Sequence, residues 1–143
     1  MKETFSFQVK RLPQQTFEAL TDLERFAQAS QGKASIAAVP DRPRAGKGSA
    51  VLIKTAAEGG VGDVLCETLE WEPPRRCVRR FAIKDLPTTI GIDCREKDDG
   101  TQVTVDLELE PQSLMYKMML PVLASRFRAE KDKVLAQLQQ QLA

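Results

Sequence analysis

The stretch TIGIDCREKDDGTQVTVDLELE (residues 89–110) alternates apolar and polar side chains on both sides of a Lys-Asp-Asp-Gly turn. If Glu96 pairs with Thr101 across this turn, the apolar side chains of both strands fall on one face of an antiparallel hairpin. The apolar pairs across the two strands are then Cys94 with Val103, Ile92 with Val105 and Ile90 with Leu107. The sequence therefore predicts a hairpin with one buried and one solvated face.

Further strands extend this sheet toward the N-terminus. The segments are rich in β-branched and aromatic residues, and turns containing Gly or Pro separate most of them, one being Glu58-Gly59-Gly60. The additional strands are predicted at TFSFQV (4–9), a short apolar run (36–39), SAVLIKTA (49–56), GDVLCETLE (62–70) and CVRRFAIK (77–84). With the two strands of the hairpin, the sheet is expected to have roughly seven strands.

Two short helices are predicted between the first and second strands. Pro13 suits the first turn of a helix that turns Phe17 and Leu20 inward. Thr21 and Glu24 have the spacing of a capping box, so a second helix is expected to start at Asp22 and to carry Leu23 and Phe26 on its apolar side.

The C-terminal segment, residues 112–143, contains no glycine and repeats apolar residues at helical spacing. Pro121 leaves two alternatives, because proline cannot donate a hydrogen bond to the carbonyl four residues back. Either a first helix ends at Leu120, or one long helix continues through the proline with a kink.

Composition limits the chemistry. The 143 residues suit one globular domain, and 21 basic against 20 acidic residues give a net charge of only +1, so no global field attracts nucleic acid or an anionic membrane. Histidine is absent, which argues against histidine-dependent catalysis and zinc sites. Three widely spaced cysteines suit free thiols in a reducing compartment. With no apolar run long enough to span a bilayer, a soluble, cytoplasmic protein is expected.

The order of these elements resembles the helix-grip superfamily of START, Bet v 1 and polyketide cyclase-like proteins. The matching residues are the proline-led helix with its Leu-x-Asp segment (13–28), the glycine at position 48, the acidic strand and Pro-Pro-Arg turn (67–76), the Gly-Thr-x-Val-Thr strand (100–104) and the long closing helix. This resemblance covers nearly the whole chain, residues 1–143, as a single domain. It implies an α+β fold, in which a curved antiparallel sheet wraps around the C-terminal helix and leaves a largely apolar cavity. The superfamily has no universal catalytic residue, so the fold alone does not assign a reaction.

The arginine-rich stretch LEWEPPRRCVRRF (69–81) offers a polar group for that cavity. If Leu69 opposes Cys77, then Leu65 opposes Phe81, and Glu67 opposes Arg79 on a face that is otherwise apolar. In that register Cys66 and Cys77 point to opposite faces. Arg79 is then predicted to anchor a ligand carboxylate, phenolate or ketone oxygen. The alternative is a solvent-facing salt bridge between Glu67 and Arg79.

The cavity wall is expected to combine the inner faces of the strands with the closing helix. The candidate ligand-binding residues are Val51, Ile53, Leu65, Glu67, Leu69, Arg79, Phe81, Ile92, Val105, Leu107, Met115, Met118, Met119 and Val122. The methionines either give an adaptable pocket or fill the core. No catalytic residue, metal ligand or cofactor is assigned.

Three classes of function remain open. The first is non-catalytic binding or carriage of a hydrophobic small molecule such as a lipid, a polyketide or an aromatic metabolite. The second is a polyketide cyclase-like enzyme that polarises its substrate with Arg79, Glu67 or Tyr116. The third is a protein-binding module that uses basic residues of the 42–47 or 126–133 segments. Nucleic acid and integral membrane association are not expected, and a homodimer is left open.

Overall fold

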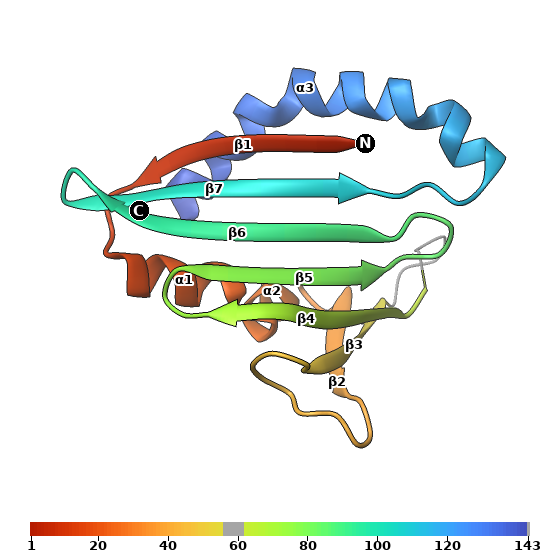
Figure 1. Cartoon of the computed structure of the whole chain (residues 1–143), viewed down its shortest axis with the longest axis horizontal. Coiled ribbons are helices and arrows are strands. Elements are labelled where there is room, and N and C mark those ends of the chain that lie inside the picture. Colours follow the sequence, from red (N-terminus) through yellow and green to blue (C-terminus); the bar gives the residue numbers. More distant parts are fainter. Residues whose placement is uncertain (56–61, 143) are drawn as a thin grey trace.

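The computed structural model describes residues 1–55 and 62–142, which form one sheet and three helices (Figure 1). The strands are β1 (Lys2–Val9), β2 (Ala34–Ala38), β3 (Ala50–Thr55), β4 (Val64–Glu72), β5 (Arg76–Ala82), β6 (Thr88–Lys97) and β7 (Gly100–Leu109). The helices are α1 (Pro13–Thr21), α2 (Leu23–Ala29) and α3 (Leu114–Leu142). The predicted α+β architecture is confirmed; the turn expected at residues 58–60 lies outside the described residues.

The strands form one antiparallel sheet in the order β1-β7-β6-β5-β4-β3-β2. The register of the β6–β7 hairpin is the predicted one, because Glu96 is paired with Thr101 and Cys94 with Val103. β1 then pairs with β7 along its whole length, with Phe5 opposite Val105. We call the side of the sheet that carries these apolar residues the inner face.

The predicted register between β4 and β5 is wrong. Trp71, rather than Leu69, is paired with Cys77, and Arg79 is paired with Thr68, because the register shifts between Thr68 and Glu70. The irregularity leaves Leu69 without a partner, as in a β-bulge, and reverses the alternation of side chains beyond it. It therefore brings Trp71 to the inner face in place of Leu69.

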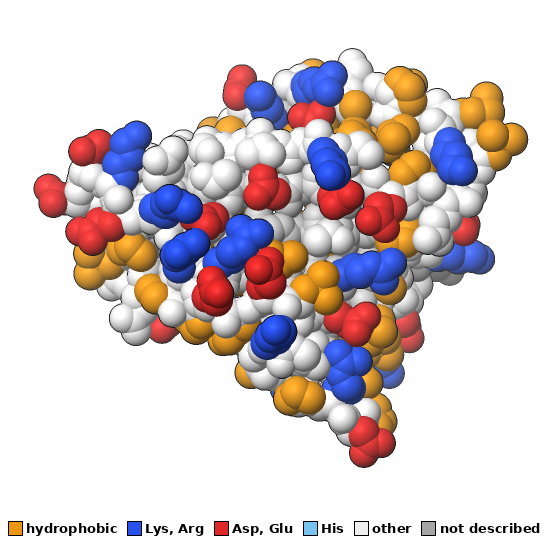
Figure 2. Space-filling model, in the orientation of Figure 1, with side chains coloured by type: hydrophobic (Ala, Val, Ile, Leu, Met, Phe, Trp, Pro, Cys, Tyr) orange, Lys and Arg blue, Asp and Glu red, His pale blue; other side chains and the backbone are white. Residues whose placement is uncertain are grey.

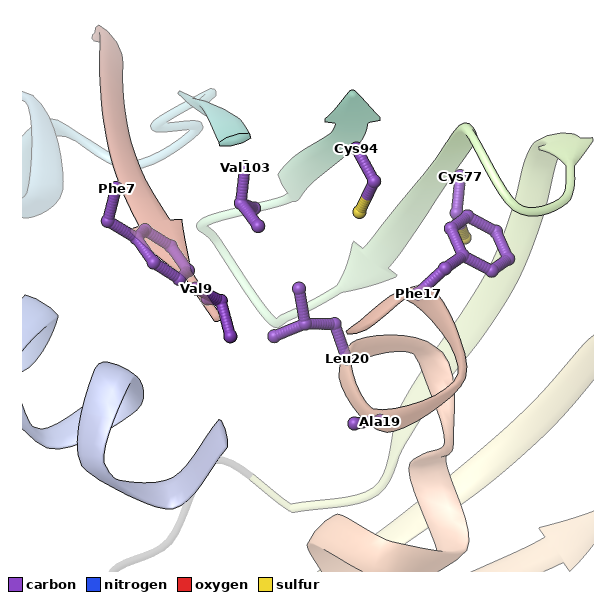
Figure 3. Packing of buried hydrophobic residues seen from close by; sticks show 8 residues of the cluster. All are labelled: Phe7, Val9, Phe17, Ala19, Leu20, Cys77, Cys94 and Val103. Carbon is purple, nitrogen blue, oxygen red and sulfur yellow. The ribbon is translucent and has the colours of Figure 1, made fainter. Parts of the chain in front are cut away.

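Helix α1 covers the inner face, and the hydrophobic core lies between them. Phe17 and Leu20 of α1 point toward Cys77, Cys94 and Val103 of the strands (Figure 3). The ring of Phe17, which is 1% exposed, lies 5.2 Å from the Trp71 ring, measured between ring centroids. Pro13 occupies the first turn of α1, as predicted.

Helix α2 starts one residue later than predicted and is not closed by the expected capping box. Asp22 is its N-cap and accepts a hydrogen bond from the Arg25 backbone N–H at 3.3 Å. Thr21 instead belongs to α1 and donates its hydroxyl to the carbonyl of Phe17 at 2.8 Å. Asp22 alone thus separates the two helices, which together reach across the sheet from β7 and β6 toward β2.

Helix α3 is one continuous helix with Pro121 inside it, which decides between the two alternatives left by the sequence. It runs along β1 at the edge of the sheet and then passes behind it (Figure 1). The rings of Phe127 and Phe5 are 5.8 Å apart, and Arg128 forms a 2.8 Å ion pair with Glu3. These contacts cover the β1 edge of the sheet, which would otherwise expose unpaired backbone groups.

Candidate functional site

An apolar cavity of about 380 Å³ lies between the inner face of the sheet and the two short helices. Its wall comes from β1, β3, β5, β6, β7 and the α1–α2 segment. The lining residues are Phe5, Phe7, Leu20, Leu23, Phe26, Ile53, Cys77, Arg79, Phe81, Ile90, Ile92 and Val105. Among these described lining residues, Arg79 is the one charged group.

A second, more open cleft of about 660 Å³ adjoins this cavity and shares Leu23 and Arg79 with it. Its wall is more polar, because it includes the carboxylates of Glu18, Asp22 and Glu24. Arg79 therefore lines both the apolar cavity and the polar cleft.

Three contacts hold the Arg79 side chain in place. Its Nη1 donates to the backbone carbonyl of Thr21 at 2.7 Å, and its Nε donates to the hydroxyl of Thr68 at 3.3 Å. The guanidinium carbon lies 5.7 Å from the centroid of the Trp71 ring, within range of a cation–π interaction. No carboxylate of the described residues forms an ion pair with Arg79, so its positive charge is oriented but not neutralised.

Glu67, the expected partner of Arg79, is on the other side of the sheet. It is paired with Arg80 across β4 and β5, and its carboxylate accepts a hydrogen bond from Arg42 at 3.3 Å. The bulge at Leu69 explains the error. The prediction assumes that side chains alternate regularly along β4, whereas the bulge shifts this alternation by one residue. The acid-base pair in the cavity is therefore a wrong prediction, whereas the inward direction of Arg79 agrees with the structure.

The segment between β2 and β3 closes one side of the polar cleft. Arg44 of this segment forms a 3.2 Å ion pair with Glu24 of α2, and both side chains are more than half exposed. Arg42 donates to the carbonyl of Gly48 as well as to Glu67, which ties the base of the segment to the sheet. An exposed ion pair of this kind contributes less than about 1 kcal/mol, so it does not fix the segment strongly.

The predicted site residues separate into two groups. Those that line the apolar cavity are Ile53, Arg79, Phe81, Ile92 and Val105, while Val51 lines the polar cleft. Those that line neither are Leu65, Glu67, Leu69, Leu107, Met115, Met118, Met119 and Val122. Leu65, Glu67 and Leu69 are displaced by the changed β4–β5 register, and the α3 residues lie on the solvent side of their helix, where Met118 is 71% exposed.

Several wall residues were not predicted as part of the site. Leu20, Leu23 and Phe26 come from the α1–α2 segment, and Trp71 completes the cleft behind Arg79. The helical spacing of Leu20, Leu23 and Phe26 does predict that these three residues face inward. The sequence gives no signal that the space beneath them is left partly empty, because that depends on the distance between the helices and the sheet.

The three cysteines are free and buried, and Cys77 lines the apolar cavity. Burial raises the pKa of the Cys94 thiol from its ordinary value of 9.0 to about 12 and that of Cys66 to about 11; in Cys66 the Arg79 charge opposes the effect of burial. Cys66 and Cys77 share the inner face, contrary to the predicted register. These thiols are therefore protonated and poorly nucleophilic at neutral pH.

Stability is expected to fall in alkali because of these thiols. The unfolded thiol ionises above its ordinary pKa of 9.0 while the buried one keeps its proton, so the stabilisation is complete below about pH 9 and is lost toward pH 12. Urea unfolding at about pH 8 and at about pH 10 gives the free energy of unfolding at each pH. Between these two pH values, the free energy of unfolding of Cys94→Ala should fall by roughly 1 kcal/mol less than that of the unmodified protein. Equal losses in the two proteins would contradict the assignment.

The charged group that lines the apolar cavity suits binding and polarisation of a ligand oxygen. Among the described residues no group of three His, Cys, Asp or Glu side chains is placed to hold a metal ion. Tyr116, half-buried on α3, does not line either cavity. At the site the Arg79 guanidinium can donate to an anionic or carbonyl oxygen, and the carboxylates of Glu18, Asp22 and Glu24 line the adjoining cleft.

Comparison with known proteins agrees with this fold. Residues 2–143 match the family described as polyketide cyclase/dehydrase and lipid transport. Similar solved structures include Ara h 8.0201 (12% identity, TM-score 0.71, 99% of this chain and 97% of that chain) and a START superfamily protein from Mycobacterium smegmatis (14%, 0.69, 97% and 97%). A protein from Thermus thermophilus is also similar (16%, 0.67, 99% and 97%). No curated protein matches the sequence.

Proposed function

Because the chain belongs to the polyketide cyclase/dehydrase and lipid transport family, we propose that it binds and carries a hydrophobic small molecule with one anionic or carbonyl oxygen. The apolar body of the molecule occupies the cavity, and the oxygen accepts hydrogen bonds from Arg79. The observation that carries this proposal is the Arg79 guanidinium, held at the cavity wall by Thr21, Thr68 and Trp71 without a carboxylate partner among the described residues.

The size and chemistry of the cavity support this ligand class. Its volume of about 380 Å³ is at the lower end of the range for small-molecule sites, which suits an aromatic metabolite or a short lipid rather than a large one. Apolar side chains supply most of the wall, so burial of the ligand's apolar surface contributes most of the affinity. Arg79 then selects for the polar end.

Carriage is supported over a cyclase-type reaction by the position of Glu67. In the enzyme alternative, Glu67 is one of the groups expected to polarise the substrate, but its carboxylate is bound to Arg42 on the opposite side of the sheet. Arg79 itself stabilises negative charge on an oxygen but does not accept a proton, because arginine stays protonated. The carboxylates of Glu18, Asp22 and Glu24 line the adjoining cleft rather than the apolar cavity.

Two fluorescent probes test the proposal directly. Anilinonaphthalene sulfonate carries an anionic group on an apolar aromatic body, and N-phenylnaphthylamine is the same body without the sulfonate. Both are expected to bind the native protein at one saturable site, with the sulfonate bound more tightly, and native mass spectrometry of freshly purified protein should reveal a co-purifying hydrophobic molecule. Absence of saturable binding of both probes, together with empty protein in the mass spectrum, would count against the proposal.

A further inference from the structure

The first turns of α3 expose an apolar surface that has no role in the cavity. We call it the Leu-Met stripe; its residues are Leu114, Met115, Met118, Met119 and Val122. Their spacing places them along one side of the helix, and their side chains are between 43% and 74% exposed. Hydrophobic side chains gather at this corner of the molecule, at the upper right of Figure 2.

The opposite side of the same turns is also apolar. Leu120, Leu123 and Ala124 are partly or fully buried toward the protein, and Phe127 packs on Phe5 of β1. A helix that is apolar on both sides is normally covered on both sides. The inward residues account for the packing of α3, so the Leu-Met stripe is available to another surface.

The charges around the stripe indicate what that surface is. Residues 111–129 contain Lys117, Arg126 and Arg128 but neither Asp nor Glu. Arg128 is paired with Glu3, whereas Lys117 and Arg126 are exposed and form no ion pair with the residues that the structure describes. Within this segment, which Glu110 and Glu130 bound, the charges beside the apolar stripe are therefore positive only, although the whole chain is nearly neutral.

We propose that the Leu-Met stripe docks the protein onto an anionic lipid surface. The stripe lies at the boundary of headgroups and acyl chains, and Lys117 and Arg126 meet the lipid phosphates. No helix in the described part of the chain is both long and apolar enough to cross a bilayer, so α3 lies in the surface. Phe5, which supports α3 through Phe127, also lines the apolar cavity, so the docked helix and the cavity share a wall.

A second copy of the chain fits the stripe less well. A twofold dimer would place the same patch against itself, so the cations of residues 111–129 would face each other without an acidic residue from that segment to neutralise them. An anionic membrane neutralises them and also accepts the methionine and leucine side chains. Charge complementarity thus selects the lipid surface.

Flotation of the full-length protein with vesicles tests this proposal. Binding is expected with vesicles of equal parts phosphatidylcholine and phosphatidylglycerol, and much weaker binding with phosphatidylcholine alone. The double variant Lys117→Gln and Arg126→Gln should lose about fivefold in partitioning for each cation removed. The double variant Met118→Gln and Val122→Gln should lose more than about tenfold, because it removes the inserted apolar surface.

Matched variants at distant exposed positions control for charge and polarity. Lys10→Gln with Lys97→Gln makes the same charge change where β1 and β6 end, away from the Leu-Met stripe. Leu12→Gln with Leu69→Gln makes the same polarity change at exposed leucines on other surfaces. Both controls should bind vesicles like the unmodified protein. The proposal is overturned if the protein does not bind the anionic vesicles, or if the control variants lose as much vesicle binding as the test variants. It is also overturned if light scattering shows a dimer that the double variant Met118→Gln and Val122→Gln dissociates. No cargo is needed, so failure of this test leaves the cavity proposal intact.

Discussion

Replacing Arg79 by methionine is expected to weaken binding of anilinonaphthalene sulfonate about a hundredfold and to leave N-phenylnaphthylamine binding nearly unchanged. Methionine keeps an unbranched apolar chain in the wall but removes the guanidinium that meets the sulfonate. The guanidinium is already oriented by Thr21 and Thr68, so it loses little freedom when the probe binds. Fluorescence titration of both probes gives the two affinities.

Arg80→Met is the matched control for this change. Arg80 is the next residue of β5, on the outer face of the sheet and paired with Glu67, so the same substitution there removes a charge without reaching the cavity. Arg79→Lys should retain part of the affinity for the sulfonate, because lysine keeps the charge but not the fork of donors. If Arg79→Met weakens both probes equally, or Arg80→Met weakens the sulfonate as much, Arg79 is not the anion anchor.

Replacing Phe17 by alanine is expected to lower the free energy of unfolding by about 3–5 kcal/mol. Phe17 is among the largest fully buried side chains of the described residues, and it fills the space between α1 and the inner face of the sheet. Its removal leaves a hole that the ring of Trp71 alone does not fill, and it loosens the Trp71 side chain that lies beneath Arg79. Urea unfolding followed by circular dichroism measures the loss.

Phe26→Ala separates packing from cavity effects. Phe26 lines the cavity from α2 but is 46% exposed, so its loss should cost about 1 kcal/mol or less in stability while weakening both probes. If Phe17→Ala does not fold, Phe17→Leu should still be destabilised by more than Phe26→Ala. Equal destabilisation of Phe17→Leu and Phe26→Ala would show that Phe17 is not the central core contact.

The sequence predicts the hairpin of β6 and β7 because alternation and turn agree there. The Lys-Asp-Asp-Gly turn fixes the register, and a shift by one residue would place every apolar side chain in water. Between β4 and β5 the same argument fails. The unpaired Leu69 lets two registers satisfy the alternation, and the correct one depends on Trp71 finding Phe17 on a helix far away in the sequence.

Arg79 was placed correctly despite this error because β5 alternates without interruption. Cys77, Arg79 and Phe81 fall on one face whatever pairs with them. For the methionines of α3, in contrast, the sequence pattern alone does not predict which side of the helix is buried. Helical spacing divides the first turns of α3 into two apolar faces, but it does not say which one meets β1, and the structure turns Leu123 and Phe127 inward and Met118 outward.

The strand order has a consequence for how the protein assembles. In the described sheet, each neighbouring pair except one joins strands that follow each other along the chain; the exception is β1 with β7. The hydrogen bond from Thr4 to Asp106 on this pair bridges 102 residues, so among the strand pairs of the sheet the β1–β7 pair closes the longest loop and carries the greatest loss of chain entropy. β1 thus leaves the ribosome before the other strands of this sheet but gains its partner only after β7 has been made, so the sheet cannot be completed strand by strand in chain order.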